Sequence, residues 1–138
     1  MAKQKITIVS EIAAPVERVW EAYTRPEAVT QWNFASNDWC CTRAEADLKV
    51  GGKYCARMEA KDGSFGFNFE GVYEQVELHK AITLLMTDGR KARTTFEING
   101  KMTKVSTAFD AEDQNSIEMQ RDGWQAILNN FKRYCESQ

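Results

Sequence analysis

The sequence predicts a single α+β domain in which a curved antiparallel sheet of about six to seven strands packs on one long C-terminal helix. Two observations predict it. About six segments between residues 44 and 109 alternate apolar and polar residues and are separated by short turn sequences. The last segment, from about residue 115, instead places its apolar residues at helical spacing. The 138 residues fit one domain, and one helix covering such a sheet gives two layers.

The N-terminal segment "KITIVSEI" alternates and predicts the first strand, apolar enough on both faces to be mostly covered. Pro15 begins a short helix, because a proline at the first position loses no helical hydrogen bond. The apolar face of this helix consists of Val16, Val19, Trp20 and Tyr23. Pro26 begins a second short helix, which we expect to end near Trp32.

Alternation predicts six further strands after the irregular segment "NFASNDWCC". They are expected at 44–50, 54–60, 65–76, 81–86, 92–98 and 103–109. The sequences "VGGKY", "KDGS", "TDGR" and "NGK" mark turns, and His79 lies at another. In the third of these strands the apolar residues change from odd positions, up to Phe69, to even positions from Val72. Gly71 at this change predicts a β-bulge and a bend.

The long helix has one broad apolar face. Asn115 and Glu118 have the spacing of a capping box at its start. Within about 40° of Trp124 on a helical projection lie Ile117, Gln120, Leu128, Phe131 and Cys135. Gln120 is polar and needs hydrogen-bond partners if it is buried. Gly123 lies at the edge of this face, where glycine costs about 1 kcal/mol relative to alanine. We infer a cavity between sheet and helix; a closely packed core is the alternative.

Composition argues against several classes of function. The charge is nearly balanced, with 18 basic and 20 acidic residues, and no basic stripe indicates nucleic-acid binding. No apolar run has membrane-spanning length and the N-terminus has no signal-peptide pattern, so we expect a cytoplasmic protein. The four cysteines match no zinc spacing and are expected to be free thiols, with a reactive thiol at Cys40 or Cys41 as the alternative. The single histidine supplies no catalytic triad or multi-histidine metal site, and we expect no cofactor.

Several stretches carry a fairly specific combination of residues. They are "APVERVWEAYTRPEAVTQW", "NDWCC", "ADLKVGGKYCARMEAKDGSFGFNFEGVYEQV", "LLMTDGR" and "EMQRDGWQAILNNFKRY". Together they resemble the family of homologues of the activator of the 90-kDa heat-shock-protein ATPase, in the START or birch-pollen-allergen superfamily (SRPBCC). The resemblance extends from about Ile6 to Tyr134 and implies one START-like domain over residues 1–138 with the helix-grip fold, a curved sheet that grips a long C-terminal helix. The superfamily includes carriers of lipids and steroids, plant-hormone receptors and aromatic cyclases.

Two departures limit what the resemblance carries over. The eukaryotic activator has a large additional N-terminal domain that this sequence does not contain, which leaves chaperone activation as an alternative. Family members often have a histidine just after "DW", where this chain has Cys40 and Cys41. No histidine-dependent role at that place is therefore carried over.

The favoured function is binding of a small apolar or aromatic ligand in the inferred cavity. Candidate ligand-binding residues come from the sheet, the long helix and the rim. They are Phe67, Phe69, Met86 and Phe96 of the sheet, Gln120, Gly123, Trp124 and Ile127 of the helix, and Trp32, Asp38 and Trp39 of the rim. Core packing is the alternative for each aromatic residue, and capping of its own loop is the alternative for Asp38. No residue is assigned a catalytic or metal-binding role.

Two other functions stay open. A cyclase- or hydrolase-type enzyme would need an acid or base inside the cavity. The groups available are the carboxylates Asp38, Glu59, Glu70 and Asp88, with Arg57 or Arg90 as anion-binding groups. Strand alternation places Arg57 and Glu59 on the solvent face. An interaction protein that acts on a chaperone is the other function, and we expect a monomer or a homodimer.

Overall fold

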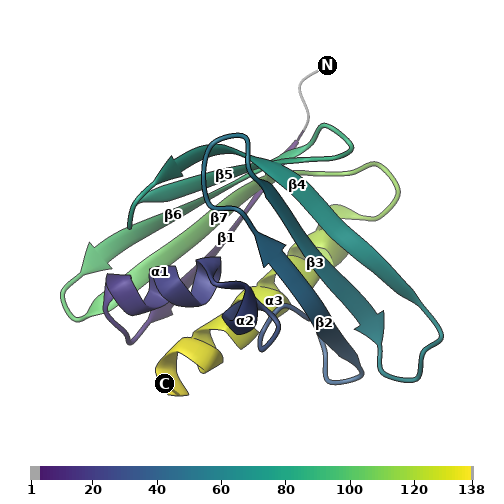
Figure 1. Cartoon of the computed structure of the whole chain (residues 1–138), viewed down its shortest axis with the longest axis horizontal. Helices are drawn as coiled ribbons and strands as arrows, with labels where there is room; N and C mark the ends of the chain where they lie inside the picture. The colour runs from purple at the N-terminus through teal and green to yellow at the C-terminus, as the bar shows by residue number, and fades with distance from the viewer. Residues whose placement is uncertain (1–3, 138) are drawn as a thin grey trace.

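The computed structural model describes residues 4–137, which form one antiparallel sheet of seven strands and three helices (Figure 1). The elements are β1 (Lys5–Ile12), α1 (Val16–Thr24), α2 (Pro26–Val29), β2 (Trp39–Ala46), β3 (Lys53–Ala60), β4 (Gly66–Glu77), β5 (Ala81–Met86), β6 (Lys91–Asn99), β7 (Met102–Asp110) and α3 (Ile117–Ser137). The strand order is β1-β7-β6-β5-β4-β3-β2. Every neighbouring pair is consecutive along the chain except β1 and β7, which are the first and the last strand in the sequence.

The sheet curls around α3, which runs across its concave face (Figure 1). In this view β2 and β3 cross in front of α3, while β1, β6 and β7 lie on its other side. The two short helices connect β1 to β2, and α1 packs against α3, β6 and β7. This is the helix-grip arrangement of an α+β domain, and the predicted fold class is confirmed.

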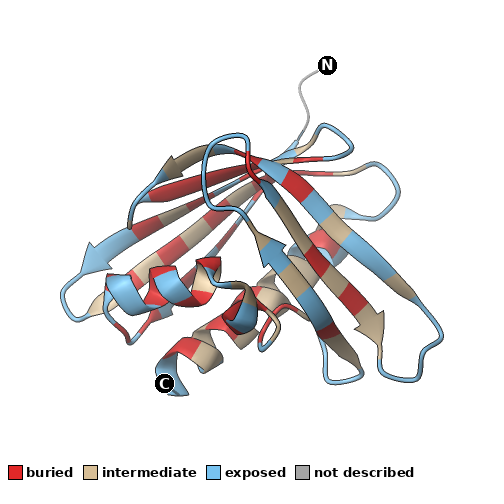
Figure 2. Ribbon diagram, in the orientation of Figure 1, coloured by how far each residue is buried: buried red, intermediate tan, exposed pale blue. Residues whose placement is uncertain are grey.

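Burial shows that only one face of the sheet is covered. Buried and exposed bands alternate along the strands (Figure 2). In β1, Ile6, Ile8 and Ile12 are buried, whereas Val9 on the other face is 42% exposed. The expectation that both faces of this strand are covered was therefore wrong. Its inward residues pack under α3, and its outward residues meet solvent because the convex face carries no helix within residues 4–137.

The strand expected at 44–50 lies in fact at Trp39–Ala46. The alternation continues beyond the strand because Leu48 and Val50 are apolar, but both are exposed in the loop that follows. That loop is tight at Gly52, where an added Cβ would lie 1.9 Å from the carbonyl oxygen of Asp47. The start of the strand was missed because its pairing with β3 is irregular between Cys41 and Arg43, which interrupts the alternating pattern.

The predicted irregularity in β4 exists but lies three residues later than expected. The pairing of β4 with β5 shifts between Tyr73 and Gln75. The inward side continues through Gly71 to the buried Tyr73, and Val72 points outward with 37% exposure. Glycine is required at Gly71 for a different reason: a Cβ there would lie 2.8 Å from both Cγ of Leu84 and the carbonyl oxygen of Leu85.

The long helix begins with a serine cap. The Ser116 hydroxyl accepts the backbone N–H of Met119 at 3.1 Å, which satisfies one of the unpaired amides of the first turn. The prediction that Asn115 caps the helix was wrong, because the helix begins at Ile117 and the side chain that accepts a first-turn amide is that of Ser116. The predicted inward face is confirmed: the buried residues of α3 are Gln120, Leu128, Phe131 and Cys135.

Candidate functional site

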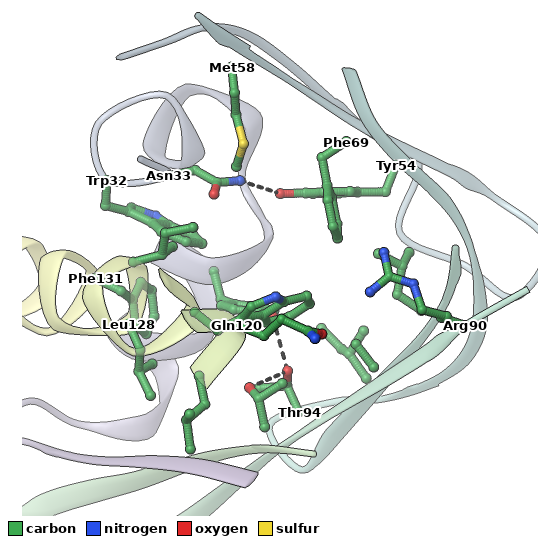
Figure 3. A pocket seen from close by; sticks show the side chains of 18 of the residues that line it. Trp32, Asn33, Tyr54, Met58, Phe69, Arg90, Thr94, Gln120, Leu128 and Phe131 are labelled. Carbon is green, nitrogen blue, oxygen red and sulfur yellow. Dashed lines mark hydrogen bonds between the residues drawn. The ribbon is translucent and has the colours of Figure 1, made fainter. Parts of the chain in front are cut away.

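A pocket of about 330 Å³ lies between the concave face of the sheet and helices α1 and α3 (Figure 3). Its volume is at the lower end of the range of ligand pockets, roughly 300–1,000 Å³. The wall is mainly aromatic and aliphatic. Its apolar residues are Ile8, Tyr23, Trp32, Tyr54, Met58, Phe67, Phe69, Tyr73, Ile82, Leu84, Ala92, Trp124, Ile127, Leu128 and Phe131, and its polar residues are Asn33, Arg90, Thr94, Thr107, Glu112, Asn115 and Gln120.

The pocket brings together six of the residues that were predicted to bind a ligand. They are Trp32, Phe67, Phe69, Gln120, Trp124 and Ile127. The other five predicted residues, Asp38, Trp39, Met86, Phe96 and Gly123, are not part of its wall.

Two inward residues of the sheet, Phe96 and Met86, do not line the pocket. Phe96 is 6% exposed and its ring packs edge-on against Trp20 and Tyr23, with centroids 5.2 and 5.5 Å apart. Met86 is 5% exposed in the core. Both are core residues, which was the alternative considered for the aromatic candidates.

Two of the three predicted rim residues, Asp38 and Trp39, lie outside the wall of the pocket. The carboxylate of Asp38 accepts the Ser36 hydroxyl at 2.5 Å, which is the local loop contact considered as its alternative role. The ring of Trp39 packs against Phe65 and Phe67, each with centroids 6.0 Å away. Of these rings, only Phe67 also lines the pocket.

Gly123 faces open space on the flank of α3. A Cβ built at this position would have no heavy atom within 4 Å, apart from its chain neighbours and the backbone of its own helix. Gly123, which the sequence placed among the cavity residues, is not part of the wall of the pocket, and close packing of another backbone segment does not explain the glycine.

Gln120 fixes the loop that leads into α3. Its side-chain oxygen accepts the backbone N–H of Glu112 at 2.9 Å. Its amide nitrogen donates to the carbonyl oxygens of Glu112 and Asn115 at 3.1 and 2.9 Å. Both amide protons are used in this way, which meets the hydrogen-bond requirement of a buried glutamine. We conclude that Gln120 holds the backbone of Glu112 and Asn115, two other residues of the pocket wall, in place.

Aromatic contacts hold the wall in place from two sides. Trp124 stacks on Phe109 with centroids 3.9 Å apart and 10° between the ring planes. The edge of Phe69 meets the same indole at 5.9 Å. Across the pocket, Trp32 packs against Phe131 at 4.7 Å. These contacts bury large rings in defined orientations, and they leave the space between the two groups unfilled.

Hydroxyl groups supply a portion of the polar lining of the pocket. Tyr23 and Thr94 share a hydrogen bond of 3.0 Å, and Thr94 shares one of 2.8 Å with Thr107. The Tyr54 hydroxyl accepts the side-chain amide of Asn33 at 3.1 Å (Figure 3). Burial raises the pKa of the Tyr54 hydroxyl well above its usual value, so the group is neutral and keeps its proton to donate.

Two charged side chains line the pocket within residues 4–137: Arg90 and Glu112. Glu112 accepts the backbone N–H of Asn115 at 2.6 Å. Arg90 follows the turn after β5, a place where sequence alone gives no sign that a side chain turns inward. The carboxylates considered for acid–base chemistry, Asp38, Glu59, Glu70 and Asp88, do not line the pocket.

Other kinds of site find no support in the described residues. Within residues 4–137 no three His, Cys, Asp or Glu residues lie together as metal ligands would. The four cysteines are free thiols, with Cys41 and Cys135 buried. His79 lies in the turn between β4 and β5 with φ +60° and packs against Trp20. No helix of the described chain is long and apolar enough to cross a membrane.

Comparison with known proteins gives the same fold over nearly the whole chain. An AHSA1-like protein from Aeromonas hydrophila is 42% identical, with a TM-score of 0.92 over 97% of this chain and 93% of that one. A protein from Cytophaga hutchinsonii is 43% identical, with a TM-score of 0.83 over 96% and 92%. A protein from Nitrosomonas europaea is 19% identical, with a TM-score of 0.84 over 96% and 94%, and shows the fold alone. No curated protein matches the sequence significantly.

The family model described as "Activator of Hsp90 ATPase homolog 1-like protein" matches residues 13–136. This range contains both short helices, six of the seven strands and nearly all of α3. The fold and the wall of the pocket therefore come almost entirely from the matched region. The chain belongs to the family of Activator of Hsp90 ATPase homolog 1-like proteins.

Proposed function

We propose that the protein binds a small, largely apolar or aromatic molecule in the pocket between the sheet and α3. The observation that carries the proposal is the unfilled volume of about 330 Å³, walled by aromatic and aliphatic side chains with a few polar groups. This is the usual composition of a small-molecule site. The fold is compatible with such a role, since α3 closes one side of a curved sheet.

The proposal is tested with a neutral apolar dye, N-phenylnaphthylamine, whose fluorescence rises in apolar surroundings. Ala92 lies in the wall of the pocket and Ala108 on the convex face of β7. Replacing Ala92 with phenylalanine places a ring in the pocket, and we expect dye binding to weaken by about tenfold or more. Ala108→Phe, the matched control, should bind the dye like the original protein. Absence of dye binding to the original protein, or equal binding by both variants, would contradict the proposal.

A second candidate function is interaction with a chaperone, as the family description suggests. The specific observation in its favour is an exposed aromatic group at the starts of β2 and β4. Phe65, just before β4, and Phe67 are 61% and 40% exposed, and Trp39 packs against both. Exposed apolar side chains that lie together are typical of interaction surfaces. The function would be supported if this protein stimulates the ATP hydrolysis of a purified 90-kDa chaperone and the Phe65→Ser variant does not.

We further propose a cytoplasmic location and a monomer or homodimer. The free state of the four cysteines supports the location, since reducing compartments maintain thiols. Native mass spectrometry of the freshly purified protein measures the assembly and any retained small molecule together. Cell fractionation tests the location.

A further inference from the structure

Arg90 is the one cationic side chain that lines the pocket in the described part of the chain. It lies just before β6, and its guanidinium points into the cavity opposite the group formed by Trp32, Asn33 and Phe131 (Figure 3). The side chain is only 19% exposed. Its charge is therefore partly removed from water, in a wall that is otherwise mainly apolar.

Protein contacts hold one side of the guanidinium and leave the other available. Nε donates to Oδ2 of Asp88 at 2.7 Å, and the backbone N–H of Arg90 donates to Oδ1 of the same carboxylate at 3.0 Å. Nη1 makes one long contact of 3.5 Å with the carbonyl oxygen of Asp110. Nη2 makes no hydrogen bond within residues 4–137. The end of the guanidinium that carries Nη1 and Nη2 can therefore donate to a ligand.

We propose that the ligand of this pocket carries a carboxylate that binds the Nη1–Nη2 end of Arg90, while its apolar body lies along the aromatic wall. The inference rests on the proposed function and specifies its ligand class. Guanidinium and carboxylate are both planar, and two parallel N–H···O bonds match them. Asp88 fixes the guanidinium in advance, so little side-chain freedom is lost when the ligand binds.

The surrounding charges favour a group with one negative charge over a group with two. Asp88 already neutralises much of the Arg90 charge at 2.7 Å. Glu112 adds a second acidic side chain to the wall of the pocket, and its hydrogen bond from Asn115 holds it there. A phosphate monoester, which carries nearly two charges at neutral pH, would be repelled by both carboxylates. A carboxylate gains the directed hydrogen bonds of Arg90 with less repulsion.

Paired probes separate the charged group from the apolar body. Naphthoate and decanoate are compared with naphthamide and decanamide, their uncharged counterparts, and with naphthyl phosphate, by isothermal titration calorimetry. We expect each acid to bind about tenfold or more tightly than its amide and naphthyl phosphate to bind more weakly than naphthoate. Equal binding of acid and amide by the original protein would overturn the inference and leave the proposed function standing.

Substitutions assign the preference to Arg90. In Arg90→Gln we expect acids to lose their advantage while amides bind as before, which also shows that the pocket is intact. Arg90→Lys keeps the charge without the planar pair of donors and should retain only part of the advantage. Arg93→Gln, on the exposed face of β6, is the control and should change nothing. An acid preference that survives in Arg90→Gln would overturn the inference, whereas failure of every probe to bind the original protein would overturn the proposed function as well.

Discussion

Replacing Gly123 with alanine adds one methyl group to the middle of α3, on a side of the helix that faces open space. An added Cβ has no heavy atom of another element within 4 Å, so neither crowding nor new packing is expected. The change in stability should then come from helix propensity alone, which favours alanine over glycine by about 0.8–1.0 kcal/mol. We therefore expect the free energy of unfolding to rise by that amount.

The size of the effect is measurable in two ways. For 138 residues, an unfolding entropy of about 2.1 cal/mol/K per residue converts 1 kcal/mol into a rise in Tm of about 3 °C. Urea denaturation should show a higher midpoint with an unchanged slope, because the surface exposed on unfolding hardly changes. The sequence alone suggested that this glycine leaves room for a ligand. Because Gly123 is not part of the wall of the pocket, binding of N-phenylnaphthylamine should instead be the same in Gly123→Ala.

Gly71→Ala is the matched control, because it adds the same methyl group where there is no room. Its Cβ would lie 2.8 Å from the carbonyl oxygen of Leu85, a backbone atom that cannot rotate away. Overpacking of this kind typically costs about 1–3 kcal/mol. A Gly123→Ala variant that is no more stable than the original protein, or that loses stability as Gly71→Ala does, would refute the reasoning.

Three further predictions concern buried groups. Phe131 is fully buried, so Phe131→Ala should lower the free energy of unfolding by about 3–5 kcal/mol in urea titration, and a loss below about 1 kcal/mol would contradict its role as an anchor. Burial raises the pKa of the Tyr54 and Tyr73 hydroxyls in the folded protein above the value of 10.0 expected in the unfolded chain. The free energy of unfolding should therefore keep its full value below pH 10.0 and fall as the pH rises above it. Tyrosinate absorbance that develops fully while the circular dichroism stays native would oppose this. Burial raises the pKa of the Cys135 thiol to about 12, so in the native protein iodoacetamide should modify Cys135 more slowly than the less buried Cys40. All four thiols should react after denaturation. Equal reaction rates of Cys135 and Cys40 in the native protein would contradict the prediction.

Periodicity predicted the architecture because most strands of this sheet have one covered and one exposed face. It failed where local structure departs from the regular pattern. The bulge near Thr42 hid the first half of β2, and the exposed Leu48 and Val50 extended the apparent strand into a loop. The start of α3 was misplaced by one residue because Asn115 and Ser116 are both good capping residues, and only the hydrogen bond between the Ser116 hydroxyl and the Met119 amide decides between them.

The pocket was predicted less completely than the fold, because a pocket is the space that the inward-pointing side chains leave empty. Phe69 and Phe96 both point inward from the sheet, yet only Phe69 lines the pocket, since Trp20 and Tyr23 cover Phe96. No spacing in the sequence distinguishes these two cases. Arg90 was considered only as an anion-binding group of an enzyme, and its position in the wall depends on how the turn after β5 is placed.

The pairing of β1 with β7 has a consequence for how the protein folds. The ion pair between Lys5 and Asp110 joins residues 105 positions apart in the sequence. All of β1, an edge strand, is likewise held by hydrogen bonds to the distant strand β7. By contrast, β2 to β7 form by successive hairpins between near neighbours. Since closing a long loop costs more chain entropy than closing a short one, we expect the hairpins to assemble first and β1 to dock last. During synthesis we therefore expect the apolar side of β1 to stay uncovered until β7 has left the ribosome.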